Sequence, residues 1–370
     1  YDDREVRAAV ERSLAPLGGL GSVVKKGDRV LIKLNLLSSK RPEQAVTTHP
    51  ALAKAVVRMV QERGGVPVLG DSPGGNNTFV SYRAVLKNAG IQAVADETGC
   101  EIVSFEDRTV DVTADEARTF RKIKVAQAVV DADVVLALPK LKTHALTYYT
   151  GAIKLLFGYV PGMMKMEYHS HAGRDVDLFS ELLLDIHSVR PPDLVVMDAV
   201  VGMEGEGPSG GAPRQIGLLL ASRSCAALDY AAVSLIGADP HAIPTIRRAK
   251  ERGEGPGSLG EVRIYGEDLA SVALKDFKMP RTMGVPPSGT GRQLMGMMGR
   301  LRASRPVIDK GRCKKCGVCA KDCPARAMMF ANGAVPRIDY DKCIRCYCCQ
   351  ELCPQQAVTV KVPWTRRILH

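Results

Sequence analysis

Eight cysteines in this 370-residue sequence have the spacing needed to bind a metal cluster. They fall in two runs, GRCKKCGVCAKDCP and DKCIRCYCCQELCP, so the pattern C-x2-C-x2-C-x3-C-P occurs twice with each position displaced by thirty residues. A cubane iron–sulfur cluster needs four thiolates that converge on one small volume, and the short spacings can wrap three of them around one cluster. The fourth cysteine of each run, which precedes a proline, is then placed to bind the other cluster.

The two ligand sets are therefore expected to interleave. The first set is Cys313, Cys316, Cys319 and Cys353, and the second is Cys343, Cys346, Cys349 and Cys323. These residues resemble the bacterial two-cluster ferredoxin family over roughly residues 307 to 360. The resemblance implies two 4Fe-4S clusters and one-electron transfer at low potential.

Zinc sites and disulfides are the other uses of so many cysteines. Zinc knuckles rarely contain two four-cysteine runs that each end in Cys-Pro. A secreted disulfide framework would spread its cysteines along the chain, whereas nine of the eleven here lie in the last sixty residues. The ninth, Cys348, has no place in either set and is expected to be a packed or spare thiol.

A second group of residues that could do chemistry lies in the segment 139–171, which holds three of the seven histidines and four lysines. Such a group can bind a carboxylate or phosphate, and a desolvated Lys or a His can move protons near neutral pH. The alternative is a solvated basic surface. The concentration of histidines favours a functional site, whose expected members are Lys140, Lys142, His144, Thr150, Lys154, Lys165, His169 and His171.

Further polar residues follow other predicted strands. Lys33 and Asn35 lie at the end of the first strand. Thr47, Thr48 and His49 could bind an anion, or the threonines could simply cap the next helix. Asp71 could be a ligand, a base or a turn residue, and Glu204 an acid or base in a glycine-rich loop that could equally be a flexible surface loop. We expect His144, Lys154, His169, His171 and Glu204 to be catalytic. We expect the substrate to be bound by Lys33, Asn35, Asp71, Lys140, Lys142 and Thr150.

The elements that must position these residues alternate along the chain. Apolar, β-branched runs predict strands at residues 28–37, 101–104, 121–125 and 133–138, and in VPVLGD, DLVVMDAVVG and IGLLLAS. Helical spacing of apolar residues predicts helices at 2–15, 79–90, 144–157 and 176–189, and in ALAKAVVRMVQERGG and CAALDYAAVSLIG. This alternation predicts an α/β fold with a mostly parallel sheet, helices on both faces, and ligands at the carboxyl ends of the strands.

Changes in composition divide the chain. We expect an α/β domain at 1–277, a linker at 278–306, a small α+β ferredoxin-like domain at 307–362 and a tail at 363–370. The linker contains RQLMGMMGRLRASRP, which is expected to form a helix that packs one domain on the other, or alternatively to contact a membrane surface or a partner. Trp364 in the tail is expected to dock on the α/β domain.

The composition is that of a globular protein, with 45% hydrophobic and 25% charged residues and no run of eighteen apolar residues. The charged segment YDDREVRAAVERSL does not resemble a signal peptide, so a cytoplasmic location is expected. The net charge of +11 suits an acidic electron-transfer partner such as a ferredoxin, or an anionic small molecule. Nucleic acid is not expected because no basic stripe is interleaved with aromatic residues, and membrane contact is a weaker alternative.

Two further family resemblances concern the α/β part. The stretches VLIKLNLL, TTHP, GDSPGG, LPKLKTHALTYYTGAIKLLFG, MDAVVGMEGEGPSGG and ALDYAAVSLIG resemble the family named domain of unknown function 362 over roughly residues 25 to 240. The segment from His144 to Lys154, with His169 or His171 downstream, is similar to the N-terminal domain of lactate racemase-type enzymes. That similarity implies a Lys that carries a nickel-pincer nicotinic acid cofactor, matching Lys154, and a His that assists it.

Three functions are consistent with these features. The first is an iron–sulfur reductase that passes single electrons to an anionic or carbonyl substrate in the α/β domain. The second is a non-enzymatic electron carrier or assembly factor, which predicts a shallow basic surface at residues 139–171 in place of a closed pocket. The third is a racemase or isomerase in which the clusters are structural.

Overall fold

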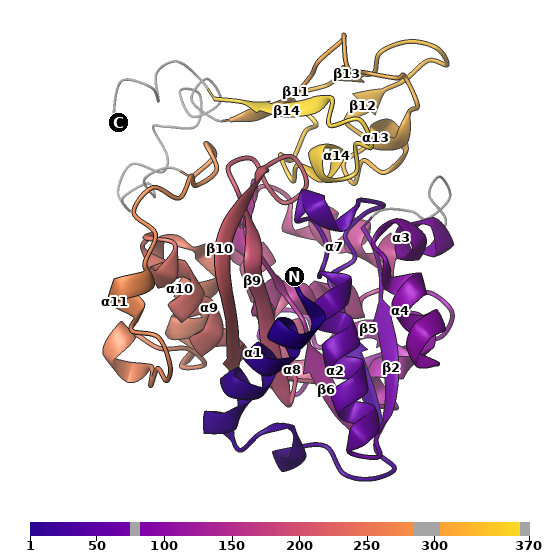
Figure 1. Ribbon diagram of the computed structural model, residues 1–370. Coiled ribbons are helices and arrows are strands. Elements are labelled where there is room, and N and C mark those ends of the chain that lie inside the picture. The colour runs from indigo at the N-terminus through magenta and orange to yellow at the C-terminus, as the bar shows by residue number, and fades with distance from the viewer. Residues whose placement is uncertain (75–81, 284–303, 363–370) are drawn as a thin grey trace.

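The computed structural model describes residues 1–74, 82–283 and 304–362 (Figure 1). A large α/β unit is followed by a small C-terminal unit, which lies over one end of the large unit's sheet (Figure 1). Among the described residues, no helix has both the length and the apolar character needed to cross a bilayer.

The α/β unit is built on an eight-stranded sheet of order β3-β2-β1-β6-β9-β7-β8, in which β10 also pairs with β9. Its strands are β1 (Arg29–Lys33), β2 (Val66–Asp71), β3 (Glu101–Ser104), β6 (Val134–Ala137), β7 (Lys140–His144), β8 (Tyr148–Thr150), β9 (Leu194–Glu204) and β10 (Ala212–Ser222). All pairs are parallel except β7 with β8 and β9 with β10. The predicted mostly parallel α/β sheet is confirmed.

Helices cover both faces of this sheet. One face carries α1 (Asp3–Leu14), α2 (Pro50–Glu62), α3 (Tyr82–Asn88) and α4 (Ile91–Thr98). The other carries α5 (Gln127–Val130), α6 (Ala152–Leu155), α7 (Gly162–Ala172), α8 (Val176–Val189), α9 (Cys225–Leu235) and α10 (Pro244–Arg252), and α11 (Leu269–Val272) packs beside them. Side chains along β1 point alternately into two hydrophobic cores. Val30 and Ile32 pack into the core beneath α1 to α4, and Leu31 packs into the core on the opposite face.

Several predicted elements differ from the structure. The helix predicted at 144–157 is wrong: β7 turns back into β8, and only the short helix α6 follows. Thr147, Tyr148 and Tyr149 fit a strand better than a helix, and this preference outweighed the apolar spacing. The strand predicted at 28–37 ends at Lys33. The strand predicted at 121–125 is β5 (Lys122–Ala126), which pairs with β4 (Thr109–Thr113) in a separate hairpin. Helices α7 and α10 were not predicted.

The C-terminal unit has two small antiparallel sheets and two short helices. Its elements are β11 (Arg305–Ile308), α13 (Val318–Lys321), β12 (Met328–Met329), β13 (Arg337–Ile338), α14 (Cys348–Glu351) and β14 (Val358–Lys361). The helix predicted in the linker falls mainly on 284–303, and the docking of Trp364 falls on 363–370. Both predictions therefore concern residues outside those described.

Candidate functional site

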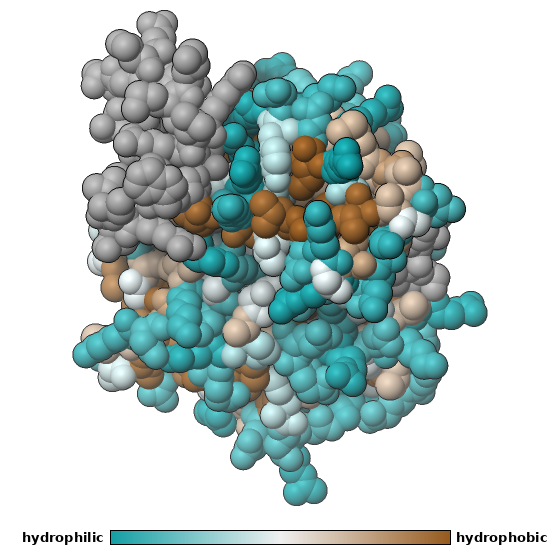
Figure 2. Space-filling model, turned by 90° about the horizontal axis from the view of Figure 1, so that it is seen from above, coloured by the Kyte–Doolittle hydropathy of each residue, from teal (hydrophilic) through white to brown (hydrophobic). Residues whose placement is uncertain are grey.

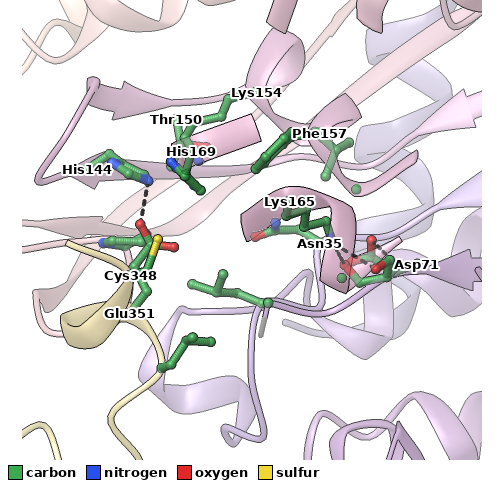
Figure 3. Close-up of a pocket in the computed structure, with 18 of the residues that line it drawn as sticks. Asn35, Asp71, His144, Thr150, Lys154, Phe157, Lys165, His169, Cys348 and Glu351 are labelled. Atoms are coloured by element: carbon green, nitrogen blue, oxygen red, sulfur yellow. Dashed lines mark hydrogen bonds and ion pairs between the residues drawn. The ribbon is translucent and has the colours of Figure 1, made fainter. Parts of the chain in front are cut away.

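A cavity lies between the α/β unit and the C-terminal unit (Figure 3). It contains about 760 Å³ of space free of protein atoms, including its opening to solvent. The α/β unit contributes Lys33, Asn35, Asp71, Ser72, Lys142, His144, Thr150, Lys154, Phe157, Lys165 and His169, among others. The C-terminal unit contributes Asp322, Cys348, Glu351 and Leu352.

The β7–β8 hairpin places three of the predicted residues at the cavity. Side chains two residues apart on a strand share one face, so Lys142 and His144 lie together, and Thr150 is directly opposite Lys142 on β8. Lys140 shares that face but lies farther back along the strand. There its Nζ is 2.8 Å from Asp198 and 2.9 Å from the hydroxyl of Tyr1, and it does not line the cavity.

The orientation of helix α7 determines which of the two candidate histidines faces the cavity. Lys165 and His169 are one helical turn apart and both line the cavity. His171 lies two residues further along, about 200° around the helix. It is exposed and packs edge-on against Phe120 at 4.8 Å between ring centroids. His171, predicted as a site residue, therefore does not line the cavity.

Three of the four lysines at the cavity already have partners. Lys33 donates to Asp71 at 2.6 Å and to the carbonyl oxygen of Leu34 at 2.7 Å. Lys142 donates to Asn35 Oδ1 at 2.6 Å and to the Val46 carbonyl at 2.7 Å. Lys165 donates to the carbonyl and the hydroxyl of Ser72, at 2.5 and 2.7 Å.

A glycine completes the Lys33–Asp71 pair. A Cβ atom at position 158 would lie 2.5 Å from Lys33 Nζ and 2.6 Å from Asp71 Oδ1, so only glycine lets the chain cover this pair. The pair is almost fully buried and Asp71 also accepts the backbone N–H of Leu36. Lys33 and Asp71 thus form one wall of the cavity, with their charges already paired.

Lys154 is different because, within the described residues, it has no hydrogen bond or ion pair. Its Nζ lies 5.8 Å from the ring centroid of Phe157 and 5.9 Å from that of Phe179, both in the range of a cation–π contact. Burial lowers its pKa, and the charge of Glu351 opposes that shift. An ammonium group in this setting favours an incoming anion.

His169 stands next to this lysine. It is only 6% exposed and stacks on Phe179 at 4.4 Å between ring centroids. No hydrogen bond to its ring nitrogens is found in the described part of the chain. Burial lowers the pKa of His169 to about 3, so its imidazole is neutral at pH 7 and can donate one hydrogen bond into the cavity.

Burial also lowers the pKa values of two partnered lysines, because the cavity wall excludes water from their charges. The pKa of Lys142 falls to about 7, with a further contribution from the charge of Lys154. The pKa of Lys165 falls to about 8. Lys142 can therefore exchange a proton near neutral pH.

A histidine and a glutamate meet across the boundary between the units. His144 Nε2 lies 3.1 Å from Glu351 Oε1 (Figure 3). The Nδ1 atom of His144 accepts the backbone N–H of Leu146 at 3.0 Å, so the ring proton is on Nε2, the nitrogen nearer to Glu351. Burial lowers the pKa of His144 to about 4. Burial raises the pKa of Glu351, but contact with His144 and the charge of Lys154 outweigh that effect and lower it. At neutral pH a neutral imidazole therefore faces a carboxylate here.

The glycine-rich loop after β9 does not line the site as expected. Glu204 is the last residue of β9, is buried, and accepts the backbone N–H of Lys278 at 3.1 Å. Glu204, predicted as an acid or base of the site, therefore does not line the cavity. The loop instead docks the C-terminal unit: Ser209 donates to the carbonyl oxygens of Gln350 and Glu351, and Gln350 donates to the Glu206 carbonyl at 3.0 Å.

The residues at 47–49 have structural roles. Thr48 accepts the backbone N–H of Asn35 and donates to the Leu138 carbonyl. His49 caps α2 by accepting the backbone N–H of Ala51. The helix is therefore capped, but by His49 and not by one of the threonines.

The cysteines of the two runs line two smaller cavities in the C-terminal unit. One is lined by Cys313, Cys316, Cys319 and Cys353, and the other by Cys323, Cys343, Cys346 and Cys349. These are the two interleaved sets expected from the spacing. Backbone N–H groups of Ala327 and Ala357 lie 3.3 and 3.2 Å from the sulfurs of Cys323 and Cys353, an arrangement that stabilises cluster-bound thiolates. The residues present therefore fit two 4Fe-4S clusters.

Sequence comparison agrees with this geometry. Residues 30–234, which are 205 of the 370 residues, match the family described as domain of unknown function (DUF362). The chain belongs to the DUF362 family. Residues 305–354 of this DUF362 protein match the 4Fe-4S dicluster domain. Both resemblances expected from the sequence, over the α/β part and over the cysteine-rich part, are confirmed, and the chain carries an iron–sulfur electron-transfer domain.

Two known proteins are similar to this DUF362 protein. The thylakoid-associated protein sll1697 of Synechocystis sp. is 40% identical over 283 residues, which cover 76% of this chain and 86% of that protein. The structure of the lactate racemase apoprotein from Thermoanaerobacterium thermosaccharolyticum is similar with a TM-score of 0.40 and 14% identity. That similarity covers 60% of this chain and 52% of the racemase, about half its length.

The cavity of this DUF362 protein also contains residues that the sequence did not indicate. Glu351 lies between cluster-type cysteines, where it looked like an ordinary surface charge of the small domain. Cys348 was expected to be a packed or spare thiol, yet it lines the cavity, one residue before Cys349. The only signal was the extra cysteine itself, because nothing in the sequence shows which side of α14 faces the α/β unit.

Proposed function

We propose that this protein is an iron–sulfur oxidoreductase that acts on a small anionic molecule, with a carbonyl group as the reacting centre, bound between its two domains. The observation that carries the proposal is that one cavity is completed by both units. Lys154, His144 and His169 come from the α/β unit, and Cys348 and Glu351 come from the helix that also carries cluster-type cysteines. A carrier with no substrate would need only a shallow basic surface at residues 139–171, whereas this segment lines a cavity.

Lys154 would bind the anion. The other three lysines at the cavity have carboxylate, amide or carbonyl partners, so Lys154 supplies the available positive charge. The neutral imidazole of His169 and the hydroxyl of Thr150 can add hydrogen bonds from the same side. A single carboxylate or phosphate group therefore suits the site better than a polyanion.

Lys142 and Lys165 would supply the protons. Reduction of a carbonyl to an alcohol takes two electrons and two protons. Both lysines line the cavity, and burial lowers their pKa values to about 7 and about 8, so each can release a proton near neutral pH. His144 is a neutral imidazole at pH 7 and would position the substrate through its Nε2 proton.

The two cysteine sets would hold 4Fe-4S clusters, which when bound supply electrons one at a time at low potential. The second set lies closer to the cavity along the chain, since its member Cys349 lies between Cys348 and Glu351 on α14. The first set is more exposed, with Cys316 open to solvent. A partner protein would thus exchange electrons at one side of the small domain, and the substrate would contact another side.

The test is anaerobic purification followed by reduction and reoxidation. Iron and acid-labile sulfide should be present at about four of each per cysteine set. The reduced protein should be reoxidised by at least one member of a panel of small anionic carbonyl compounds that begins with pyruvate and 2-oxoglutarate, and Lys154→Met should abolish that response. If turnover of a substrate proceeded equally well with oxidised clusters and no reductant, the clusters would be structural and the racemase-type alternative would be preferred.

A further inference from the structure

The outer surface of the small domain combines an exposed cluster-type cysteine with positive charge. Cys316 is exposed, and its neighbours Arg312, Lys314 and Lys315 are exposed as well. From Asp309 to Cys323 the chain has five Lys or Arg and two Asp, of which Asp322 is buried. The positive charge therefore faces solvent around the first cysteine set.

The second half of the duplicated motif carries less positive charge than the first. The positions that correspond to Lys314 and Lys315 in the second run are Ile344 and Arg345. From Asp339 to Cys353 the chain has two Lys or Arg and three Asp or Glu. Cluster binding requires the same cysteines in both halves, so it does not account for the paired lysines of the first half alone.

Apolar side chains lie beside this positive charge. Met329 is 61% exposed and Phe330 is 39% exposed. Phe330 lies over the loop that follows Cys316, because a Cβ atom at Gly317 would be 2.6 Å from its ring. Figure 2, which views this side of the molecule from above, shows a hydrophobic band bordered by hydrophilic side chains. A small apolar centre with a charged rim is the usual composition of a transient protein interface.

We propose that this surface, formed by Arg312, Lys314, Lys315, Met329 and Phe330 around Cys316, is the docking site of an acidic one-electron carrier protein. The inference rests on the proposed function because it requires the first cysteine set to hold a cluster. Complementary charge speeds the encounter of two proteins and orients them. The apolar centre allows close approach next to Cys316, and the opposite side of the small domain remains in contact with the cavity.

The experiment measures reduction of the full-length, iron-loaded protein by a reduced, small acidic 2Fe-2S ferredoxin, together with the dissociation constant of the complex by calorimetry. The test variant is Lys314→Glu with Lys315→Glu. The matched control is Lys25→Glu with Lys26→Glu, which reverses two exposed charges in the loop before β1, at the other end of the α/β unit (Figure 1). Titanium(III) citrate, a small reductant, reports whether the clusters are intact in every variant.

We expect the test variant to lower the second-order rate constant at low ionic strength at least tenfold, to weaken binding by a similar factor, and to flatten the dependence of the rate on salt. The control variant should stay within twofold of the unaltered protein. Equal rates for the test and control variants would overturn the docking site while leaving the proposed function intact. Loss of binding to vesicles that contain phosphatidylserine, with unchanged reduction by ferredoxin, would overturn it in favour of a membrane surface. Absence of iron from the unaltered protein would remove the proposed function and this inference together.

Discussion

Glu351 of the C-terminal unit lies 3.1 Å from Nε2 of His144 in the α/β unit, so this carboxylate and this histidine at the cavity come from different domains. The contact depends on docking between the units. Arg174, which donates to the carbonyl oxygens of Asp341 and Cys343, and Ser209, which donates to residues of α14, hold the two units in this register. The small domain therefore contributes a functional group to the site in addition to its clusters.

Replacing Glu351 with Gln should separate substrate binding from turnover. The change removes a negative charge near Lys154, so affinity for phosphate or pyruvate should rise by about tenfold, equivalent to about 1.4 kcal/mol. Reoxidation of the reduced protein by substrate should slow because His144 loses its charged partner. Calorimetry and stopped-flow absorbance measure the two effects. Weaker anion binding in Glu351→Gln, with full iron content, would contradict the assigned roles.

Lys154 should account for most of the anion affinity. Lys154→Met should weaken binding of phosphate or pyruvate by about tenfold to a hundredfold, the range expected for loss of one charge-assisted hydrogen bond. Lys154→Arg keeps the charge and should recover part of the affinity, which makes it the matched control. Unfolding by urea should be similar in both variants, since this lysine has no hydrogen bond or ion pair in the described part of the chain. Equal affinities in all three proteins would show that the anion binds elsewhere.

The sequence predicted the type of fold and the location of the site because both follow from local patterns. Strands and helices alternate, and Lys33, Asp71 and Lys142 all come near the carboxyl ends of parallel strands, which meet at one edge of the sheet. The spacing of the cysteines likewise predicted which of them share a cavity. These features needed no knowledge of how distant parts of the chain pack.

The contacts that depend on distant packing were not predictable. Whether His169 or His171 faces the cavity depends on a helix, α7, that the sequence did not reveal, since its apolar residues show no clear amphipathic spacing. Glu204 was expected in the site because its loop follows a strand, but the C-terminal unit packs against that loop. Glu351 supplies a carboxylate at the cavity instead, and it lies there only because the two domains dock.

Single serine replacements should sort the cysteines into the same two sets that the cavities show. Cys316→Ser and Cys353→Ser should disturb one cluster, and Cys323→Ser and Cys346→Ser the other, each lowering iron from about eight to about four per chain. Cys348→Ser is the matched control because it changes a cysteine that lies between Cys346 and Cys349 in the chain and belongs to neither set. It should keep all of its iron. Iron analysis and electron paramagnetic resonance measure these outcomes, and loss of a cluster in Cys348→Ser would assign that thiol as a ligand.

Stability should fall as the pH drops below about 6.5. Burial lowers the pKa of His187 to about 4, with a further contribution from Arg252, and His49, His144 and His169 are shifted in the same direction. Between pH 6.5 and 4 the unfolded chain binds protons that the folded chain does not, so the free energy of unfolding decreases with falling pH, by at most about 1.4 kcal/mol per pH unit for each histidine.

His187→Gln isolates one of these contributions at a residue remote from the cysteine sets. The difference in unfolding free energy between pH 7.0 and pH 5.5 should be smaller in the variant by about 1 kcal/mol. Urea titrations at the two pH values measure it, and the cluster absorbance at each pH controls for acid damage. An identical pH dependence in the two proteins would mean that the pKa of His187 is the same in the folded and unfolded states.

Arg252 should be one of the residues on which the α/β unit depends most for stability. It is buried, its Nη1 lies 2.8 Å from Asp185 and 3.0 Å from Glu181, and its Nε lies 2.6 Å from Glu254. Asp185 also accepts three backbone N–H groups from residues 118–120, so it cannot turn to solvent when its partner is removed.

Arg252→Met leaves the buried carboxylate of Asp185 without its positive partner, while Glu181 keeps its ion pair with Arg248, and should lower the free energy of unfolding by about 3 to 5 kcal/mol. Arg29→Met, which breaks an exposed ion pair with Glu101 at 3.0 Å, is the matched control and should cost less than about 1 kcal/mol. Urea unfolding followed by circular dichroism measures both. Similar losses in the two variants would show that α8 and α10 are held together mainly by apolar packing, with the buried charges neutralised by protonation of the carboxylates.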